Sequence, residues 1–314
     1  LKATANSVYG FNGAQKGNLP GPRIASSVTK YGRGLTLRTM DMVDNNPDWK
    51  GSKVIYGDSV THDTPLLLRV RGVLMTCKIS DVAERDGATW EKYGNKERAP
   101  LQGVEVWSDN KDTFEWTKVH FVIRHKTEKL IYRVLTRRGY VDVTEDHSLL
   151  SATGEELKPD DLHSDGILHD VELMVSAFPE EPTSMIDYDY QAGYDIGSSL
   201  FYGGEGLFAT EKQRRVPNEI LTAPLEAVHG FLDGVHDTTD HRTDVRWKEL
   251  LLGIAYCAQR AGWHFRTNPA QPARGRHGLF RFVLHAPNWF STSPTPELEI
   301  NGKVRNVYPI GRTK

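Results

Sequence analysis

The chain has 314 residues, a formal net charge of −2 and a hydrophobic fraction of 38%, a size that predicts two or three domains. No apolar run approaches the roughly 20 residues needed to cross a bilayer. No signal-peptide or low-complexity pattern occurs, so we expect an intracellular protein, neither membrane-spanning nor disordered. Cys77 and Cys257 form no C-x-x-C pair, which argues against a disulfide framework or a thiolate zinc site.

The first 58 residues are more basic than the rest of the chain. They hold eight Lys and Arg against four Asp and Glu, a net charge of +4 that leaves −6 for the remainder. A basic segment is compatible with nucleic-acid binding. The chain opens on Leu1 inside a helical pattern, so we expect it to be a fragment at that end.

The elements expected in this segment are two helices and a strand. Lys2, Asn6 and Tyr9 fall on one face of the first helix, where they offer a cation, an amide and an aromatic ring. A longer helical pattern covers residues 24–43, and a buried strand then runs into the turn Tyr56-Gly57-Asp58. A carboxylate at the end of a strand is well placed to bind a metal ion.

These motifs resemble the fingers and palm of family B DNA polymerases. Asp58 resembles the first acid of their Tyr-Gly-Asp-Thr-Asp-Ser motif, which is broken here after that residue. The resemblance implies that Lys2 contacts the triphosphate, Asn6 supports the nucleotide site, Tyr9 lines the nascent pair and Asp58 binds Mg²⁺. The second acid of the motif is absent, so we expect this segment alone to be inactive as a polymerase.

Residues 59–185 are predicted to be mainly β. Alternating and β-branched patterns indicate strands at residues 66–70, 103–107, 118–123, 129–135 and 139–143. Polar turn clusters such as Ser108-Asp109-Asn110 separate them.

Two stretches of this region resemble the splicing blocks of an intein, a Hint domain. Residues 59–65 are similar to the amino-terminal block, and the strand ending at Val143, followed by Thr144-Glu145-Asp146-His147, is similar to the second block. The resemblance implies that Ser59 attacks the peptide bond before it, that His147 protonates the leaving nitrogen and that Thr144 orients the bond or stabilises the oxyanion. No cofactor is expected for this reaction.

The next region, residues 186–296, resembles a LAGLIDADG homing-endonuclease insert. Two helical stretches, at residues 192–199 and 230–240, each carry glycines four residues apart, which lets two helices approach closely. The acids that bind magnesium in active members are replaced here by Ser198 and Thr239, with Asp240 near by. We therefore expect an inactive endonuclease that can still contact DNA. A further helix is predicted from Val245 to Ala261.

The expected organisation is an α+β multidomain chain. It comprises a polymerase fingers and palm fragment (residues 1–58, helices plus one palm strand), the amino-terminal part of a mainly-β Hint splicing domain (59–185), an α/β LAGLIDADG-like insert (186–296) and the start of the carboxyl-terminal Hint part (297–314). Neither the terminal His-Asn of an intein nor the rest of the palm motif is present, so we expect this chain not to ligate anything.

The function predicted from the resemblance is that of a DNA-directed DNA polymerase precursor whose intein excises itself. After splicing, the partners would be primer-template DNA, nucleoside triphosphates and Mg²⁺, with no membrane, and the source would be a virus inside its host cell. Two alternatives remain open at this point. A Hedgehog-like Hint domain would cleave without ligating, and a non-catalytic DNA-binding insertion would make Ser59 an ordinary residue.

Overall fold

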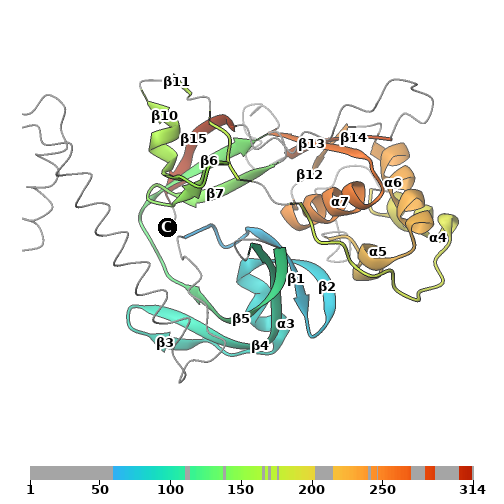
Figure 1. Cartoon of the computed structure of the whole chain (residues 1–314), viewed down its shortest axis with the longest axis horizontal. Coiled ribbons are helices and arrows are strands. Elements are labelled where there is room, and N and C mark those ends of the chain that lie inside the picture. The colour runs from blue at the N-terminus through green and yellow to red at the C-terminus, as the bar shows by residue number, and fades with distance from the viewer. Residues whose placement is uncertain are drawn as a thin grey trace, which may run out of the picture. The chain divides into compact units, whose positions relative to one another are not determined.

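Contacts in a computed structural model divide the chain into two units, Leu1–Gly57 and Asp58–Lys314. The structure describes residues 59–109, 114–136, 139–164, 167–168, 171–174, 177–201, 215–239, 242–245, 247–269, 280–286 and 304–312 (Figure 1). The predicted elements of the first 58 residues lie outside these ranges, as do the four predicted site residues Lys2, Asn6, Tyr9 and Asp58.

The first sheet of the second unit is built from five antiparallel strands. They are β1 (Pro65–Val70), β2 (Val73–Lys78), β3 (Glu91–Tyr93), β4 (Lys96–Asp109) and β5 (Phe114–Arg124), with η2 (Ile79–Asp81) and α3 (Val82–Asp86) between β2 and β3. The order is β2-β1-β4-β3, and β5 also pairs with β4. Arg71 and Gly72 both have positive φ, which suits the tight two-residue turn between β1 and β2.

A second sheet joins distant parts of the chain. Its order is β15-β6-β7, where β6 is Leu130–Thr136, β7 is Tyr140–Thr144 and β15 is Val304–Arg312. Small elements follow β7: β8 (Leu149–Leu150), β9 (Glu156–Leu157), η3 (Pro159–Leu162), β10 (His163–Ser164) and β11 (Ile167–Leu168). The strands predicted between residues 66 and 143 are confirmed, and the described region from residue 59 to residue 185 is mainly β.

Helices and a third sheet form the next region. The helices are α4 (Tyr190–Ser199), α5 (Asn218–Thr222), α6 (Leu225–Thr239) and α7 (Lys248–Arg260). The sheet has the order β12-β14-β13, with β12 at Arg242–Val245, β13 at His264–Pro269 and β14 at Phe280–His285. The chain as described therefore mixes α and β structure, as predicted.

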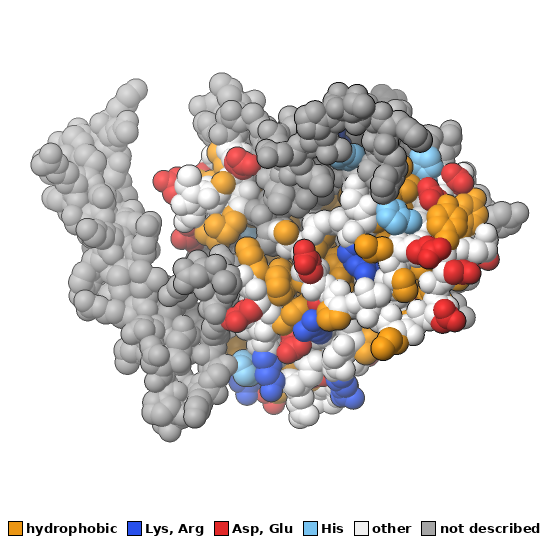
Figure 2. Space-filling model, turned by 45° about the vertical axis from the view of Figure 1, so that its right-hand side comes forward, with side chains coloured by type: hydrophobic (Ala, Val, Ile, Leu, Met, Phe, Trp, Pro, Cys, Tyr) orange, Lys and Arg blue, Asp and Glu red, His pale blue; other side chains and the backbone are white. Residues whose placement is uncertain are grey.

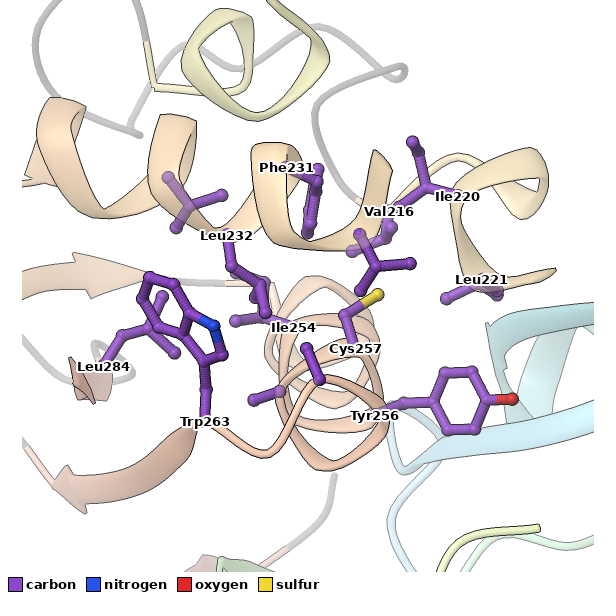
Figure 3. Close-up of a cluster of buried hydrophobic side chains, with 14 of the residues drawn as sticks. Val216, Ile220, Leu221, Phe231, Leu232, Ile254, Tyr256, Cys257, Trp263 and Leu284 are labelled. Atoms are coloured by element: carbon purple, nitrogen blue, oxygen red, sulfur yellow. The ribbon is translucent and has the colours of Figure 1, made fainter. Parts of the chain in front are cut away.

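One apolar core connects these helices to the first sheet. Figure 3 shows side chains of α5, α6 and α7 converging, among them Ile220, Phe231 and Ile254, each with no exposed surface. Leu74 of β2 belongs to the same core, and Leu67 of β1 packs against it. Burial of this apolar surface fixes the helical region against the strands near residue 65.

The start of α7 differs from the prediction. Its helical pattern was expected to begin at Val245, but Val245 pairs with Phe280 as the last residue of β12, and the helix begins at Lys248. The cross-strand partner lies 35 residues away, so local periodicity could not reveal it. The predicted stop is confirmed: Gly262 follows the helix with φ +71°, a conformation that glycine adopts without strain.

No helix among the described residues has the length and apolar character of a membrane span.

Candidate functional site

The segment that begins at Ser59 lies antiparallel to the end of β7. The facing pairs are Ser59 with Thr144, Val60 with Val143 and Thr61 with Asp142. The N–H of Thr144 donates to the carbonyl oxygen of Ser59 at 3.1 Å, and the Thr144 hydroxyl donates to the same oxygen at 3.4 Å. Two residues that are 85 positions apart in the sequence thus meet, and both were predicted site residues.

His147 lies in the turn that follows β7. Its N–H donates to the Thr144 carbonyl oxygen at 2.9 Å, which closes the turn, and the Thr144 side chain is buried. Asp146 points to Lys129, with which it forms an ion pair, and this contact lowers the pKa of the Asp146 carboxyl. Asp146 therefore fixes the turn to the start of β6.

The structure adds His125, which was not among the predicted site residues. Its Nε2 lies 3.4 Å from the Ser59 hydroxyl oxygen, and it follows the last residue of β5, Arg124. The stretch Arg124-His125-Lys126 belongs to the strand pair in which the second block is set, but the resemblance assigns this histidine no role. Because the contact spans 66 residues, no spacing rule would have selected this histidine.

The surroundings of His125 favour the neutral imidazole. Partial burial and the positive charges of Lys96 and Lys129 lower its pKa below the usual 6.5, and Asp146 opposes them. An imidazole that is unprotonated at neutral pH can accept a proton from a hydroxyl beside it. In the neutral tautomer that carries its proton on Nδ1, His125 accepts a hydrogen bond from the Ser59 hydroxyl through Nε2.

The second predicted site lies where α4 and α6 cross. A Cβ at Gly193 would approach the Ala227 oxygen to 2.0 Å, and a Cβ at Gly230 would approach the Tyr190 oxygen to 2.0 Å. Gly197 and Gly234 repeat this reciprocal pattern one turn later, against Phe231 and Tyr194. The two helices run in the same direction, and only glycine permits the approach.

The reciprocity identifies the equivalent positions of the two helices. Since Gly193 corresponds to Gly230, Ser198 corresponds to Val235, and Thr239 lies one turn farther along α6. Thr239 is buried, and its hydroxyl donates to the Val235 carbonyl oxygen at 2.8 Å. The Ser198 hydroxyl donates to a carbonyl of its own helix at 3.2 Å. Asp240 lies outside the described residues.

Acidic side chains flank this helix pair. The hydroxyl of Tyr190 donates to Asp233 at 2.7 Å, and the hydroxyl of Tyr194 donates to Asp237 at 3.1 Å. Residues 177–201 contain no Lys or Arg, and Figure 2 shows several red side chains at its right-hand edge, beside orange and pale blue ones. No cluster of three His, Cys, Asp or Glu side chains suitable for a metal ion occurs among the described residues.

Comparison with known families identifies the first segment. Residues 1–70 match the model of DNA polymerase family B, which confirms the resemblance predicted from the motifs at Lys2 and Asp58. The match runs beyond residue 58 into β1, although the structure places β1 in the second unit.

Similar proteins extend this result. The DNA polymerase of Acanthamoeba polyphaga mimivirus is 36% identical over 226 residues, or 67% of this chain and 12% of that protein. The DNA polymerase of Thermococcus aggregans is 34% identical over 220 residues, 65% of this chain and 12% of that protein. The chain thus spans about one eighth of these relatives.

A crystal structure of the transcription factor IIB Mvu mini-intein is similar at 22% identity, with a TM-score of 0.30, and covers 37% of this chain and 68% of that one.

Proposed function

We propose that this chain, whose first 70 residues match family B DNA polymerase, carries an intein that begins at Ser59 and interrupts the polymerase palm. The observation that carries the proposal is the contact of Ser59 with Thr144, which joins the two predicted splicing blocks across 85 residues. The 226-residue similarity to the mimivirus polymerase supports it, because that stretch is far longer than the polymerase match itself.

The proposed first step is an N–O acyl shift. The Ser59 hydroxyl oxygen attacks the carbonyl carbon of Asp58, the C–N bond of the Asp58–Ser59 peptide breaks, and an ester and a free amine result. His125 accepts the hydroxyl proton, and His147 donates a proton to the departing nitrogen. Thr144 holds the Ser59 carbonyl oxygen through its N–H and hydroxyl, which fixes the residue that must react.

The two alternatives differ from this proposal in specific ways. A Hedgehog-like self-cleaving domain would not be expected behind a polymerase segment that ends in half of a palm motif. A non-catalytic DNA-binding insertion gives no reason for Ser59 to lie beside both a neutral imidazole and a Thr-x-x-His turn. The proposal explains both neighbours.

The pH dependence of ester formation tests the role of His125. Its pKa is lowered from 6.5, so the neutral base is present at neutral pH and is lost only below about pH 6.5. The rate should therefore fall as the pH is lowered below about 6.5, where His125 becomes protonated. His125→Asn should lower the rate at pH 7 by about a hundredfold, the size of a general-base contribution. The readout is hydroxylamine cleavage of the ester at residue 58.

His120→Asn is the matched control, because His120 is also an exposed histidine of the β5 region. It should keep the wild-type profile. If the His125→Asn chain is cleaved by hydroxylamine at the wild-type rate and with the wild-type pH profile, His125 is not the base of the reaction.

After splicing, the proposed product is a DNA-directed DNA polymerase. Its partners would be primer-template DNA, nucleoside triphosphates and Mg²⁺. In that product Lys2, Asn6 and Tyr9 would serve the incoming nucleotide and Asp58 would bind the metal, as the resemblance implies. The mimivirus and Thermococcus relatives are both named DNA polymerases. A viral source inside a host cell is the origin we propose.

The region of residues 186–296 is proposed to be a LAGLIDADG-derived insert that no longer cuts DNA. Ser198 of α4 and Val235 of α6 occupy equivalent positions in the two helices. The Thr239 hydroxyl donates a hydrogen bond to the Val235 carbonyl oxygen of its own helix. A hydroxyl and an alkyl group supply no charge, so these residues do not fit a magnesium site. The acids Asp233 and Asp237 beside them are engaged by tyrosines.

We expect no double-strand cleavage of a plasmid that carries the uninterrupted polymerase sequence in the presence of Mg²⁺. A gel shift with the same DNA measures binding separately, because contact with DNA needs no catalytic metal. Ser198→Asp combined with Val235→Asp is the informative variant, since it restores a carboxylate at each equivalent position. Specific cleavage by the unaltered chain would contradict the prediction and direct attention to Asp240.

A further inference from the structure

Lys248 of α7 forms ion pairs with two carboxylates from another part of the fold. Its Nζ lies 2.8 Å from Asp63 Oδ2 and 2.8 Å from Asp142 Oδ2. Arg133 also donates two hydrogen bonds to Asp142, from Nε to Oδ1 at 2.7 Å and from Nη2 to Oδ2 at 2.8 Å. Two positive and two negative charges therefore form one neutral cluster.

The position of Lys248 is unfavourable without these partners. Its side chain is only 8% exposed, and a buried ammonium group is costly unless it is paired. It also opens a helix, where the helix dipole disfavours a cation. Burial is the largest single influence and would raise the pKa of Asp63, but the contacts with Lys248 and Thr61 and the nearby positive charges together lower that pKa. The two carboxylates account for a lysine at this position.

Both carboxylates lie in segments next to Ser59: Asp142 is in β7, and Asp63 is in the turn between Ser59 and β1. Asp142 is two residues before Thr144, and its backbone oxygen accepts the Thr61 N–H at 3.1 Å. Asp63 is four residues after Ser59. Lys248 thus joins, by its side chain, the two segments that the Ser59–Thr144 pairing joins by their backbones. The apolar core that α7 shares with Leu74 and Leu67 keeps the helix in place.

We propose that Lys248 is a positioning residue for the Ser59 acyl shift, supplied by the inserted region. This inference rests on the proposed function of Ser59. By holding Asp63 against Asp142, Lys248 keeps the segment after the scissile bond in register with β7, so that Thr144 contacts the Ser59 carbonyl. The inserted region, residues 186–296, would then contribute a residue to the splicing site.

Asp63→Asn in the 314-residue chain tests the Lys248–Asp63 ion pair with the least disturbance of the fold. Asp63 is 35% exposed, so the amide leaves no buried charge unpaired, while Lys248 keeps Asp142. We expect hydroxylamine-dependent release of residues 1–58 to slow by about tenfold, since displacement by about 1 Å can cost up to a hundredfold. Lys248→Met should slow it by at least as much. The double variant should be no slower than Lys248→Met alone, because both changes break one link.

Glu249→Gln is the matched control. Glu249 neighbours Lys248 on the same helix turn, is similarly buried at 7% and pairs with Lys78 of β2 at 3.6 Å. Glu249→Gln removes the ion pair between α7 and β2 but leaves the contacts of Lys248 with Asp63 and Asp142 in place. Release of residues 1–58 should therefore stay within about twofold of wild type, while the melting temperature falls.

Rates are compared among chains with matched circular dichroism spectra. Slower release in Asp63→Asn and Lys248→Met, with a wild-type rate in Glu249→Gln, supports the proposal. Equal rates in Asp63→Asn and wild type would overturn it, and so would equal slowing in all three variants. If Ser59→Ala also released residues 1–58, the proposed function itself would fail, and that outcome is distinguishable from the others.

Discussion

Ser59→Ala is expected to abolish hydroxylamine-dependent release of residues 1–58, a loss on the order of a thousandfold or more. The alanine has no oxygen to attack the Asp58 carbonyl, and no neighbouring group can replace a missing nucleophile. The fold should persist, because among the described residues the Ser59 hydroxyl contacts only His125, at 3.4 Å, and the contact of the Ser59 carbonyl with Thr144 is unchanged by the substitution.

Ser59→Cys is the matched variant for this prediction. A thiol can perform the same shift and forms a thioester, so release of residues 1–58 should then respond to added thiols as well as to hydroxylamine. Asn12–Gly13 and Asn301–Gly302 are further bonds that hydroxylamine attacks, and their cleavage should be the same in every variant. Release at residue 58 from the Ser59→Ala chain would show that the nucleophile is misassigned.

Polymerase activity is expected to depend on splicing. In the proposed precursor the intein separates Asp58 from the second acid of the palm motif. Two-metal phosphoryl transfer requires metals roughly 3.5–4 Å apart, and a misplacement of about 1 Å can cost around a hundredfold. An inserted domain within that turn should lower primer extension by at least this factor.

The measurement compares full-length precursor blocked by Ser59→Ala with the spliced enzyme, on the same primer-template and with Mg²⁺. Lys2→Ala in the spliced enzyme is the control for the nucleotide site, and it should raise KM for the nucleotide. Primer extension at comparable rates by precursor and product would mean that the palm tolerates the insertion. The prediction that polymerase activity depends on splicing would then be wrong.

Local patterns predicted the longer elements β1, β4, β5, β6, β7, α4, α6 and α7, but not all of their limits, and they did not predict β2, β3, α5 or the third sheet. The alternation of β6 and β7 and the periodicity of α7 were sufficient to place those elements within a few residues. The β12–β14 pairing that shortens α7 was not predictable, because its partners are 35 or more residues apart. Strand ends of this kind depend on tertiary contacts more than on composition.

The site was predicted in part, and the reason is similar. Ser59, Thr144 and His147 lie in short blocks with a recognisable order, so the sequence pointed to them. The sequence assigned no role to His125, in the strand pair before the second block, or to Lys248, in a predicted helix, and only the fold brings them to Ser59 and Asp63. The equivalence of Ser198 with Val235 likewise required the helix register, which the glycine contacts supply.

The most direct test of the splicing proposal is mass spectrometry of the unaltered chain after hydroxylamine treatment at neutral pH. Hydroxylamine attacks the ester carbonyl of Asp58, which forms a hydroxamate there and frees the Ser59 oxygen. The account predicts equal amounts of a fragment of residues 1–58 ending in that hydroxamate and a fragment of residues 59–314 beginning with a free Ser59 amine. A folded chain that stays intact between residues 58 and 59 under these conditions would contradict it.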